Sequence, residues 1–365
     1  MENRKYPALV MDRDALTENV RILTEDCGRQ GIEIAGIIKG AGGWVEATKA
    51  IVEGGATLIG SSRLEQLARC REAGIEVPLM MIRVPMLSEL PELIRVADIA
   101  LVSERATLDA IERQASLQDK EFKVILMADL GDLREGWWDK DEMLQTALYV
   151  EEELAHVTLA GIGTNLGCYG SVMPTEDKMQ ELADLAAKIE INIGRELEYV
   201  SGGASSSLLA VYRGYMPEKI NMLRIGAVSL IGDLEDVRVC YDLEEIDRLG
   251  RPFTLQAQVV EVKDKPTHPV GTLGVDAFGK KGVYEDRGIR RRALIAIGRA
   301  DYGDIADLVP TRKGIEIIGA SGDHTILDVE AVKDHIEVGD ILTFNLRYSA
   351  LLYLSSSENV KKYVK

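Results

Sequence analysis

The feature that most constrains the fold is a regular alternation, over the first two-thirds of the chain, of short apolar runs with longer amphipathic stretches. Each apolar run ends at a polar or glycine-rich corner, as it does at Lys39-Gly40. Such runs are typical of buried strands, and stretches with apolar residues three and four apart are typical of helices. The predicted strands cover residues 34–39, 57–61, 79–83, 99–102, 123–129, 157–164, 197–200 and 223–230. The predicted helices cover residues 14–29, 44–52, 64–73, 106–114, 141–153 and 175–193.

Strands that alternate with helices favour a parallel sheet, because each crossover helix returns the chain to the same edge. The number of predicted strands, within about 230 residues, is that of a TIM-type (β/α)8 barrel. The sequence therefore predicts an α/β barrel. A doubly wound open sheet is the alternative that the same pattern allows.

The pattern changes near Asp233, where an acidic, linker-like stretch covers residues 235–250. Strand-like runs separated by Gly, Pro and Asp follow it, which is typical of a β domain. We therefore predict a barrel domain over residues 1–233 and a β-rich domain over residues 234–365. The predicted strands of the second domain cover residues 253–262, 292–297, 315–318, 325–329 and 340–346.

Composition excludes several classes of partner. The formal net charge is −17, which disfavours nucleic acid and anionic membranes. The four cysteines are scattered without a CxxC pair, so we predict no metal site, no disulfide framework and a reducing, cytoplasmic location. The first residues lack the apolar core of a signal peptide, and no apolar run reaches the roughly 18 residues that span a bilayer.

Chemistry in a β/α barrel is carried by residues at the carboxyl ends of the strands. Lys39 ends the first apolar run of the predicted barrel. Partial burial there lowers the pKa of a lysine and exposes a neutral, nucleophilic amine, which suits imine chemistry. A lysine that snorkels at a strand end is the structural alternative. The other polar residues at strand ends favour anion binding: Ser61, Ser62, Arg63, Arg83, Asp129, Arg134, Asn165, Arg224 and Gly226.

A run of small residues from Ser201 to Ser207 joins a predicted strand to a helix. Small residues let backbone N–H groups approach an anion, and serine hydroxyls add further donors. The run from Asn221 to Gly226 lies one strand later, where barrels recurrently bind phosphate. Together the two runs indicate a phosphate-bearing ligand. A glycine-rich turn capped by serines is the alternative.

Nearly the whole chain resembles the fold-type III pyridoxal-phosphate enzymes, and within them the alanine racemase family. That resemblance implies an N-terminal (β/α)8 barrel, a C-terminal mostly β domain, pyridoxal 5′-phosphate as cofactor and an amino acid as substrate. The motifs that carry it, in family-like order and spacing, are IIKGAG (37–42), MADLGDLREG (127–136), GTNLGCYG (163–170), VSGGASSS (200–207), NMLRIGA (221–227), LGVDAFG (273–279), AIGRAD (296–301) and GASGDHTILDV (319–329).

The resemblance also implies roles for single residues. Lys39 matches the lysine that forms a Schiff base with the cofactor and then serves as one catalytic base. Arg134 matches the arginine that contacts the phenolic oxygen, and Arg224 the arginine that faces the pyridine nitrogen. The remaining implied contacts are Asn165 in the place of a histidine beside the ring, Ser205, Ser206 and Gly226 in the phosphate cradle, and Tyr348 as a phosphate-binding tyrosine.

The chain departs from alanine racemases in two places. Residues 42–44 replace a phosphate-binding tyrosine, so that contact is lost or replaced. The second catalytic base of alanine racemases is a tyrosine in a tyrosine-glycine pair supplied by the partner subunit. Here that pair reads Phe278-Gly279, and phenylalanine cannot move a proton. Substitutes predicted from nearness in the sequence are Asp276, Tyr284 and Asp323.

We therefore expect a racemase that interconverts L- and D-amino acids through an external aldimine and two-base proton transfer. Ornithine is the favoured substrate, and lysine and alanine stay open. A decarboxylase of a basic amino acid, a non-catalytic cofactor-binding protein and a sugar-phosphate enzyme are the alternatives. The resemblance further implies a head-to-tail homodimer. Acids available to receive a basic side chain are Asp132, Asp276, Glu285 and Asp286.

Overall fold

The computed structural model describes residues 4–232, 238, 242–276, 278–279 and 281–365. Contacts between residues divide the chain into two compact units. One unit is Arg13–Gly250, and the other joins Met1–Asp12 to Arg251–Lys365. The predicted boundary between residues 233 and 234 lies outside the described residues and stays a prediction.

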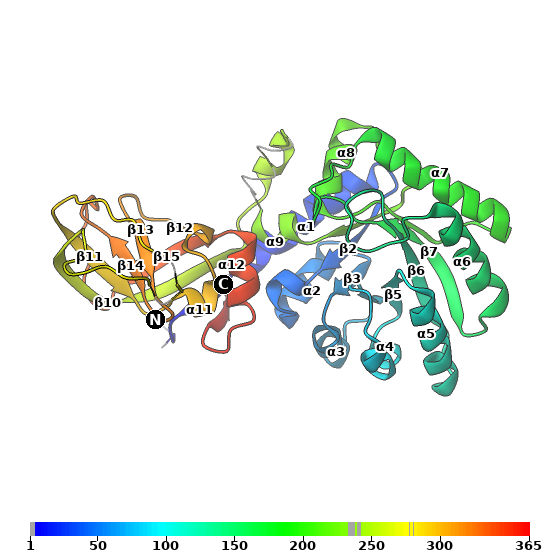
Figure 1. Ribbon diagram of the computed structural model, residues 1–365, viewed down its shortest axis with the longest axis horizontal. Coiled ribbons are helices and arrows are strands. Elements are labelled where there is room, and N and C mark those ends of the chain that lie inside the picture. Colours follow the sequence, from blue (N-terminus) through cyan, green and yellow to red (C-terminus); the bar gives the residue numbers. More distant parts are fainter. Residues whose placement is uncertain (1–3, 233–237, 239–241, 277, 280) are drawn as a thin grey trace. The chain divides into compact units, whose positions relative to one another are not determined.

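The first unit is a closed barrel of parallel strands, β2 to β9 (Figure 1). Strand β2 pairs with β9, with Ala35 opposite Arg224, so no edge is left open. This closure confirms the predicted TIM-type barrel and excludes the doubly wound sheet, which would leave both strands as edges. The strands are β2 (Glu33–Ile37), β3 (Leu58–Ser61), β4 (Leu79–Met81), β5 (Ile99–Val102), β6 (Phe122–Ala128), β7 (Val157–Thr164), β8 (Tyr199–Ser201) and β9 (Met222–Ile225).

Helices cover the outside of the barrel (Figure 1). They bury residues three and four apart, as α7 does with Met179, Leu182 and Ala186, and this helix ends at Gly194 with a positive φ of 76°. None of the described helices is long and apolar enough to cross a membrane. The helices are α1 (Arg13–Gly28), α2 (Val45–Glu53), α3 (Leu64–Glu72), α4 (Leu90–Val96), α5 (Arg105–Leu117), α6 (Lys140–Glu153), α7 (Glu176–Ile193), α8 (Leu208–Arg213) and α9 (Ala227–Ile231).

The core of the barrel is built from alternate strand residues. Ile99 and Leu101 of β5 and Ile125 and Met127 of β6 belong to one buried cluster. Alternation places every second side chain on the inner face, while the residues between them pack under the helices. Both faces are therefore buried, which explains why the strands read as continuous apolar runs.

The second unit is an antiparallel sheet in the order β12-β15-β10-β11-β14-β13. Its longest strand, β10, pairs with β15 along its first part and with β11 along its second, with an irregularity between Val259 and Glu261. This confirms the predicted β-rich unit. After Gly250, the strands and helices of this unit are β10 (Phe253–Pro266), β11 (Ile289–Ile295), β12 (Leu308–Pro310), β13 (Glu316–Ala320), β14 (Thr325–Asp328), β15 (Ile341–Leu346), β16 (Lys361–Val364), α11 (Arg299–Tyr302) and α12 (Tyr348–Leu354).

The first strand of the chain, β1 (Ala8–Met11), belongs to this second unit. It pairs antiparallel with β10 and parallel with β16, and its four residues are buried. The predicted barrel domain, residues 1–233, included this strand. Its hydrogen-bonding partners come about 250 and 350 residues later, so no local pattern reveals them.

Candidate active site

Lys39 lies two residues after the last residue of β2, in a single 3-10 turn over Lys39–Ala41. The turn closes at Gly42, where a positive φ of 62° lets the glycine N–H donate to the Lys39 carbonyl oxygen. The side chain is half-buried, and no described residue hydrogen bonds to its amine. Burial lowers the pKa of Lys39 from its ordinary value. This lysine therefore gives up its proton more readily than a surface lysine, as a nucleophile or base requires.

Titratable groups from other strand ends act electrostatically on Lys39. Besides burial, Cys168 and Glu135 raise the pKa of its amine, while Arg134 and Arg224 lower it. These groups follow or belong to β6, β7 and β9, as expected where parallel strands end together. The barrel mouth therefore gathers Lys39, Arg134 and Arg224, which the sequence analysis had named separately.

Arg224 lies inside the barrel, with 5% of its surface exposed. It donates to the Thr164 carbonyl oxygen at 2.7 Å and to the Ser201 hydroxyl. Burial lowers the pKa of Arg224 to about 10, and no described carboxylate forms an ion pair with it. A buried cation without a carboxylate is costly, so this place suits a ligand that supplies an acceptor.

Backbone N–H groups converge beside the 3-10 turn Ser205–Ser207. The Ser205 hydroxyl oxygen lies 3.4 Å from the Gly226 nitrogen and 3.5 Å from the Val228 nitrogen. Hydrogen bonds of that length are weak, so both N–H groups remain good donors for an anion. The arrangement can therefore bind a phosphate, as the glycine- and serine-rich runs predict.

The neighbouring serines hold the turn in shape. Ser206 donates to the Leu166 carbonyl oxygen at 2.9 Å, and Ser207 donates to the Gly202 carbonyl oxygen at 2.7 Å. Gly203 has a φ of +116°, and a Cβ there would lie 2.5 Å from the Ser207 hydroxyl oxygen. A side chain at this glycine would thus disturb both backbone and hydroxyl.

Asn165 follows β7. Its Nδ2 atom is buried and lacks a hydrogen-bond partner among the described residues. A buried donor without a partner costs about 1–3 kcal/mol. The amide therefore marks a place where a bound ligand would supply the acceptor.

Asp132 is not free to receive a substrate. It is buried and accepts hydrogen bonds from the N–H groups of Gly167, Cys168, Tyr169 and Val172 at 2.9–3.3 Å. Burial acts to raise its pKa, but these bonds outweigh burial and hold the pKa below its ordinary value. The carboxylate therefore organises the loop after β7, which corrects its assignment as an available acid.

Arg134 and Glu135 form a bidentate ion pair in the loop after β6. The Arg134 Nη2 atom lies 2.6 Å from Glu135 Oε1. Glu135 and Cys168 stand at the barrel mouth, yet the sequence analysis quoted them only inside motifs. The one feature that could have predicted them is their position in the sequence, since each lies in the loop that follows a barrel strand.

The residues predicted as the second base lie in the β unit. Asp276 accepts a hydrogen bond from the Phe278 N–H at 2.9 Å, and the guanidinium carbon of Arg299 lies 4.6 Å from the centre of the Phe278 ring. Tyr284 is exposed on the β10–β11 connection, and Asp323 is exposed between β13 and β14. Tyr348 begins α12 and is half-buried. Their roles stay predictions.

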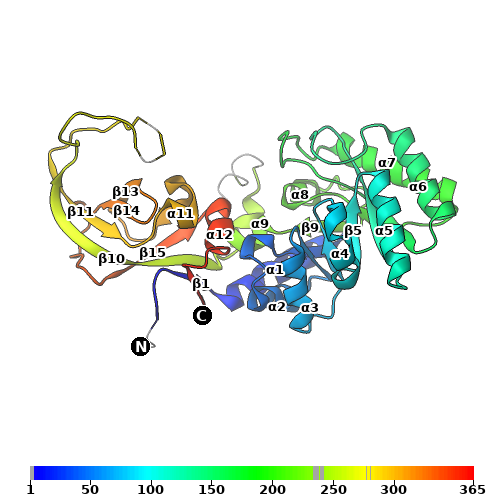
Figure 2. The same cartoon turned by 60° about the horizontal axis from the view of Figure 1, so that its bottom comes forward.

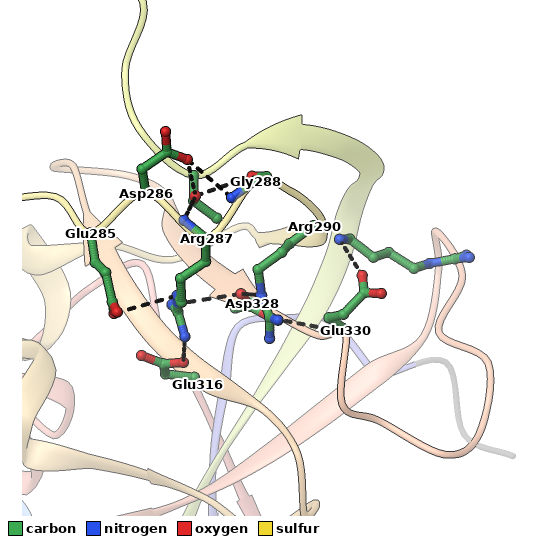
Figure 3. Close-up of polar contacts among 10 residues, drawn as sticks. Glu285, Asp286, Arg287, Gly288, Arg290, Glu316, Asp328 and Glu330 are labelled. Atoms are coloured by element: carbon green, nitrogen blue, oxygen red, sulfur yellow. Dashed lines mark hydrogen bonds and ion pairs between the residues drawn. The ribbon is translucent and has the colours of Figure 1, made fainter.

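Glu285 and Asp286 take part in a polar network at the base of the β10–β11 connection (Figure 3). The buried Asp328 carboxylate accepts hydrogen bonds from Arg290, and Arg287 bridges to Glu316 at 2.9 Å. Asp286 accepts from the Gly288 N–H at 3.0 Å. These contacts stabilise the ends of β11, β13 and β14.

Comparison with known proteins decides the family. Residues 11–233 match the model of the alanine racemase N-terminal domain. The chain belongs to the alanine racemase family. It is a pyridoxal-phosphate-dependent amino-acid racemase, and a decarboxylase or a non-catalytic binding protein is not favoured.

Relatives of this racemase match along nearly the whole chain. A lysine racemase of Thermotoga maritima is 39% identical over 98% of both chains. An ornithine racemase of Acetoanaerobium sticklandii is 37% identical over 98% of this chain and 99% of its own. The solved alanine racemase of E. faecalis has 20% identity, full coverage of both chains and a TM-score of 0.74, which shows the shared fold.

Proposed function

We propose that this racemase acts on a basic amino acid, with ornithine as the first candidate and lysine as the second. The observation that carries the proposal is that relatives named for these two substrates match over 98% of the chain at 37–39% identity. The alanine racemase 1 of Oceanobacillus iheyensis is only 25% identical over 90% of the chain. Alanine is therefore the less favoured substrate.

The barrel mouth fits pyridoxal phosphate. When bound, this cofactor supplies an electron-withdrawing ring conjugated to the amino nitrogen of the substrate, which acidifies the α-hydrogen. Lys39 would hold its carbonyl carbon, and Arg224 would donate to its ring nitrogen. The unpartnered Nδ2 atom of Asn165 supports a contact with the bound group. The other residues proposed to hold it are Arg134, Ser205, Ser206, Gly226 and Tyr348.

Lys39 also serves as one catalytic base. Its lowered pKa makes the free amine more accessible than on a surface lysine, and that amine can accept the proton from the substrate α-carbon on one face. Arg224 has N–H donors only, so it orients its acceptor without delivering a proton readily. The opposite face needs a second group. Asp276, Tyr284 and Asp323 are the candidates, with the β unit of a partner copy supplying them.

We propose a head-to-tail homodimer on this basis. The β10–β11 connection is an extended loop that stands away from the sheet (Figure 2). It exposes several apolar side chains, a feature typical of interaction surfaces. We also propose a cytoplasmic location, because Cys27, Cys70 and Cys168 are free thiols. The exposed apolar residues of the loop are Val270, Leu273, Val275, Phe278, Val283 and Tyr284.

The test is to incubate the cofactor-loaded protein separately with L-ornithine, L-lysine and L-alanine, and to follow each by chiral chromatography. We expect the D-isomer of ornithine or lysine to accumulate towards an equal mixture, with alanine converted far more slowly. Faster conversion of alanine, or release of carbon dioxide without a D-isomer, would refute the proposed substrate class.

A further inference from the structure

Carboxylates near the barrel mouth differ in whether they accept hydrogen bonds from the backbone of the surrounding loops. Asp129 accepts from the N–H groups of Gly131 and Leu133 at 2.8 and 3.1 Å. Asp132 accepts from four N–H groups of the loop after β7. Either carboxylate would have to release a loop before it could bind a ligand. Neither is therefore suited to receive a substrate.

Glu135 differs from both, because its partner is a side chain and not a loop backbone. Its side chain is only 17% exposed, and both of its oxygens contact the guanidinium group of Arg134. Its charge also acts on Lys39 and on the buried Arg224, so the carboxylate lies within electrostatic reach of the reacting amine. Within the described part of the chain, no backbone group of its own loop donates a hydrogen bond to it, so a ligand can engage the carboxylate without unfolding that loop.

The backbone fixes the position of Glu135. Leu133 has a φ of 57° and Gly136 a φ of 131°. A Cβ at Gly136 would lie 2.5 Å from the Asp129 nitrogen, so the loop is packed tightly against the end of β6. A carboxylate on so constrained a loop is preorganised, which lowers the entropic cost of binding a charged group.

We propose that Glu135 binds the side-chain ammonium group of a basic amino-acid substrate and so determines specificity. This inference rests on the proposed function, in which a basic amino acid reacts beside Lys39 at the barrel mouth. When an anionic oxygen of the ligand engages Arg134, the guanidinium group is shared between two anions, and the charge of Glu135 is less fully compensated. A substrate with a terminal ammonium group supplies the missing compensation, whereas a neutral side chain does not.

The test compares Glu135→Gln with the parent enzyme, both loaded with cofactor, on L-ornithine and L-norleucine. Norleucine replaces the ammonium group of ornithine by a methyl group of similar size. We measure KM and kcat for ornithine, and the inhibition constant of norleucine against ornithine, which needs no turnover of norleucine. Glu121→Gln is the control, because Glu121 is exposed in the turn before β6.

We expect the KM for ornithine to rise about 10–100-fold in Glu135→Gln, because a charge-assisted contact is lost. The kcat should stay within about threefold, and the norleucine inhibition constant should stay the same or fall. Glu121→Gln should match the parent. Parallel weakening of ornithine and norleucine, a fall in kcat alone, or no change would overturn the proposal, since Glu135 would then only position Arg134 or play no part.

Cofactor absorbance checks that the variant is still loaded. If Glu135→Gln does not retain the cofactor, Glu135→Asp replaces it, because aspartate keeps the charge but shortens the reach. We then expect a KM rise of about 3–10-fold for ornithine with no change for norleucine, and equal effects on both would overturn the proposal. A parent enzyme that racemises neither ornithine nor lysine would instead refute the proposed function itself.

Discussion

At the barrel mouth, burial of single charged residues costs stability but also changes their pKa in a way that the proposed chemistry needs. Lys39 and Arg224 are desolvated cations, and burial lowers the pKa of both. Desolvation disfavours the charged form of a lysine, so folding shifts Lys39 towards the neutral amine that the proposed chemistry uses. Stability and activity therefore oppose one another at Lys39.

Lys39→Met tests this opposition. Racemisation should fall by at least about 10³-fold, because one base is removed. The pKa of Lys39 is depressed in the fold, so its charged form destabilises the cofactor-free protein below that pKa and ceases to do so as pH rises toward 10.5. The cofactor-free variant should thus melt higher than the parent at pH 7, by a margin that shrinks as pH rises. Lys313→Met, at an exposed lysine, is the control, and an equal effect there would contradict the argument.

Asp132→Asn tests the loop after β7. An asparagine keeps one acceptor oxygen but directs an NH₂ group at backbone N–H donors, so we expect a loss of about 2–3 kcal/mol in unfolding free energy. Because the pKa of Asp132 lies below its ordinary value of 3.8, its stabilisation is complete above that pH and is lost as pH falls through the folded pKa. Urea unfolding at pH 7 and pH 3 should show a large difference that shrinks in acid. A constant difference would contradict the assignment.

Turns and strands, rather than whole domains, position these residues. The turn before α8 depends on Gly203, whose positive φ and closeness to Ser207 exclude a side chain. The strand β1 depends on partners from the other end of the chain. Each element makes a separate prediction.

Gly203→Ala should weaken binding of pyridoxal phosphate by about tenfold or more, because backbone strain of about 1–3 kcal/mol displaces the cradle. Gly214→Ala is the matched control, since Gly214 also has a positive φ but a Cβ there meets nothing within 4 Å. Absorbance titration of the cofactor-free variants measures the difference. Equal weakening in both variants would remove Gly203 from the cradle.

Leu9→Ala tests whether β1 stabilises the β unit. Leu9 is fully buried, so its truncation should cost about 2–5 kcal/mol. Hydrogen exchange should accelerate in β10 and β16, which pair with β1, before it accelerates in the barrel strands. Leu117→Ala, at an exposed leucine, should change little. Loss of protection in the barrel first would contradict the division into units.

At the scale of the whole molecule, the proposed dimer would build each active site from residues of two chains. Lys39 lies in one unit, and all candidates for the second base lie in the other. If each site joins the barrel of one copy to the β unit of its partner, then two differently defective copies can form one intact site.

Subunit complementation tests this arrangement. Lys39→Ala is coexpressed with whichever of Asp276→Asn, Tyr284→Phe and Asp323→Asn proves inactive alone. Random pairing should restore about a quarter of the parent activity, because half of the dimers are mixed and each mixed dimer has one intact site. Each variant expressed alone is the control. Absence of recovery in dimers shown to be mixed would refute site sharing between subunits.

The sequence by itself determined the barrel and placed Lys39 at the end of its first strand. Strand and helix periods are local, and residues at the ends of parallel strands must meet at one edge, so Lys39, Arg134 and Arg224 could be placed in a longer set of strand-end residues. The family resemblance then singled out these three. Only the tertiary structure decided that β1 joins the β unit, that Asp132 holds a loop and that Glu135 pairs with Arg134 beside Lys39. The pairing of β1 and the bonds of Asp132 depend on residues distant in the sequence. The Glu135–Arg134 pair depends on which acceptors compete for the same donors. Neither dependence produces a periodic pattern along the chain.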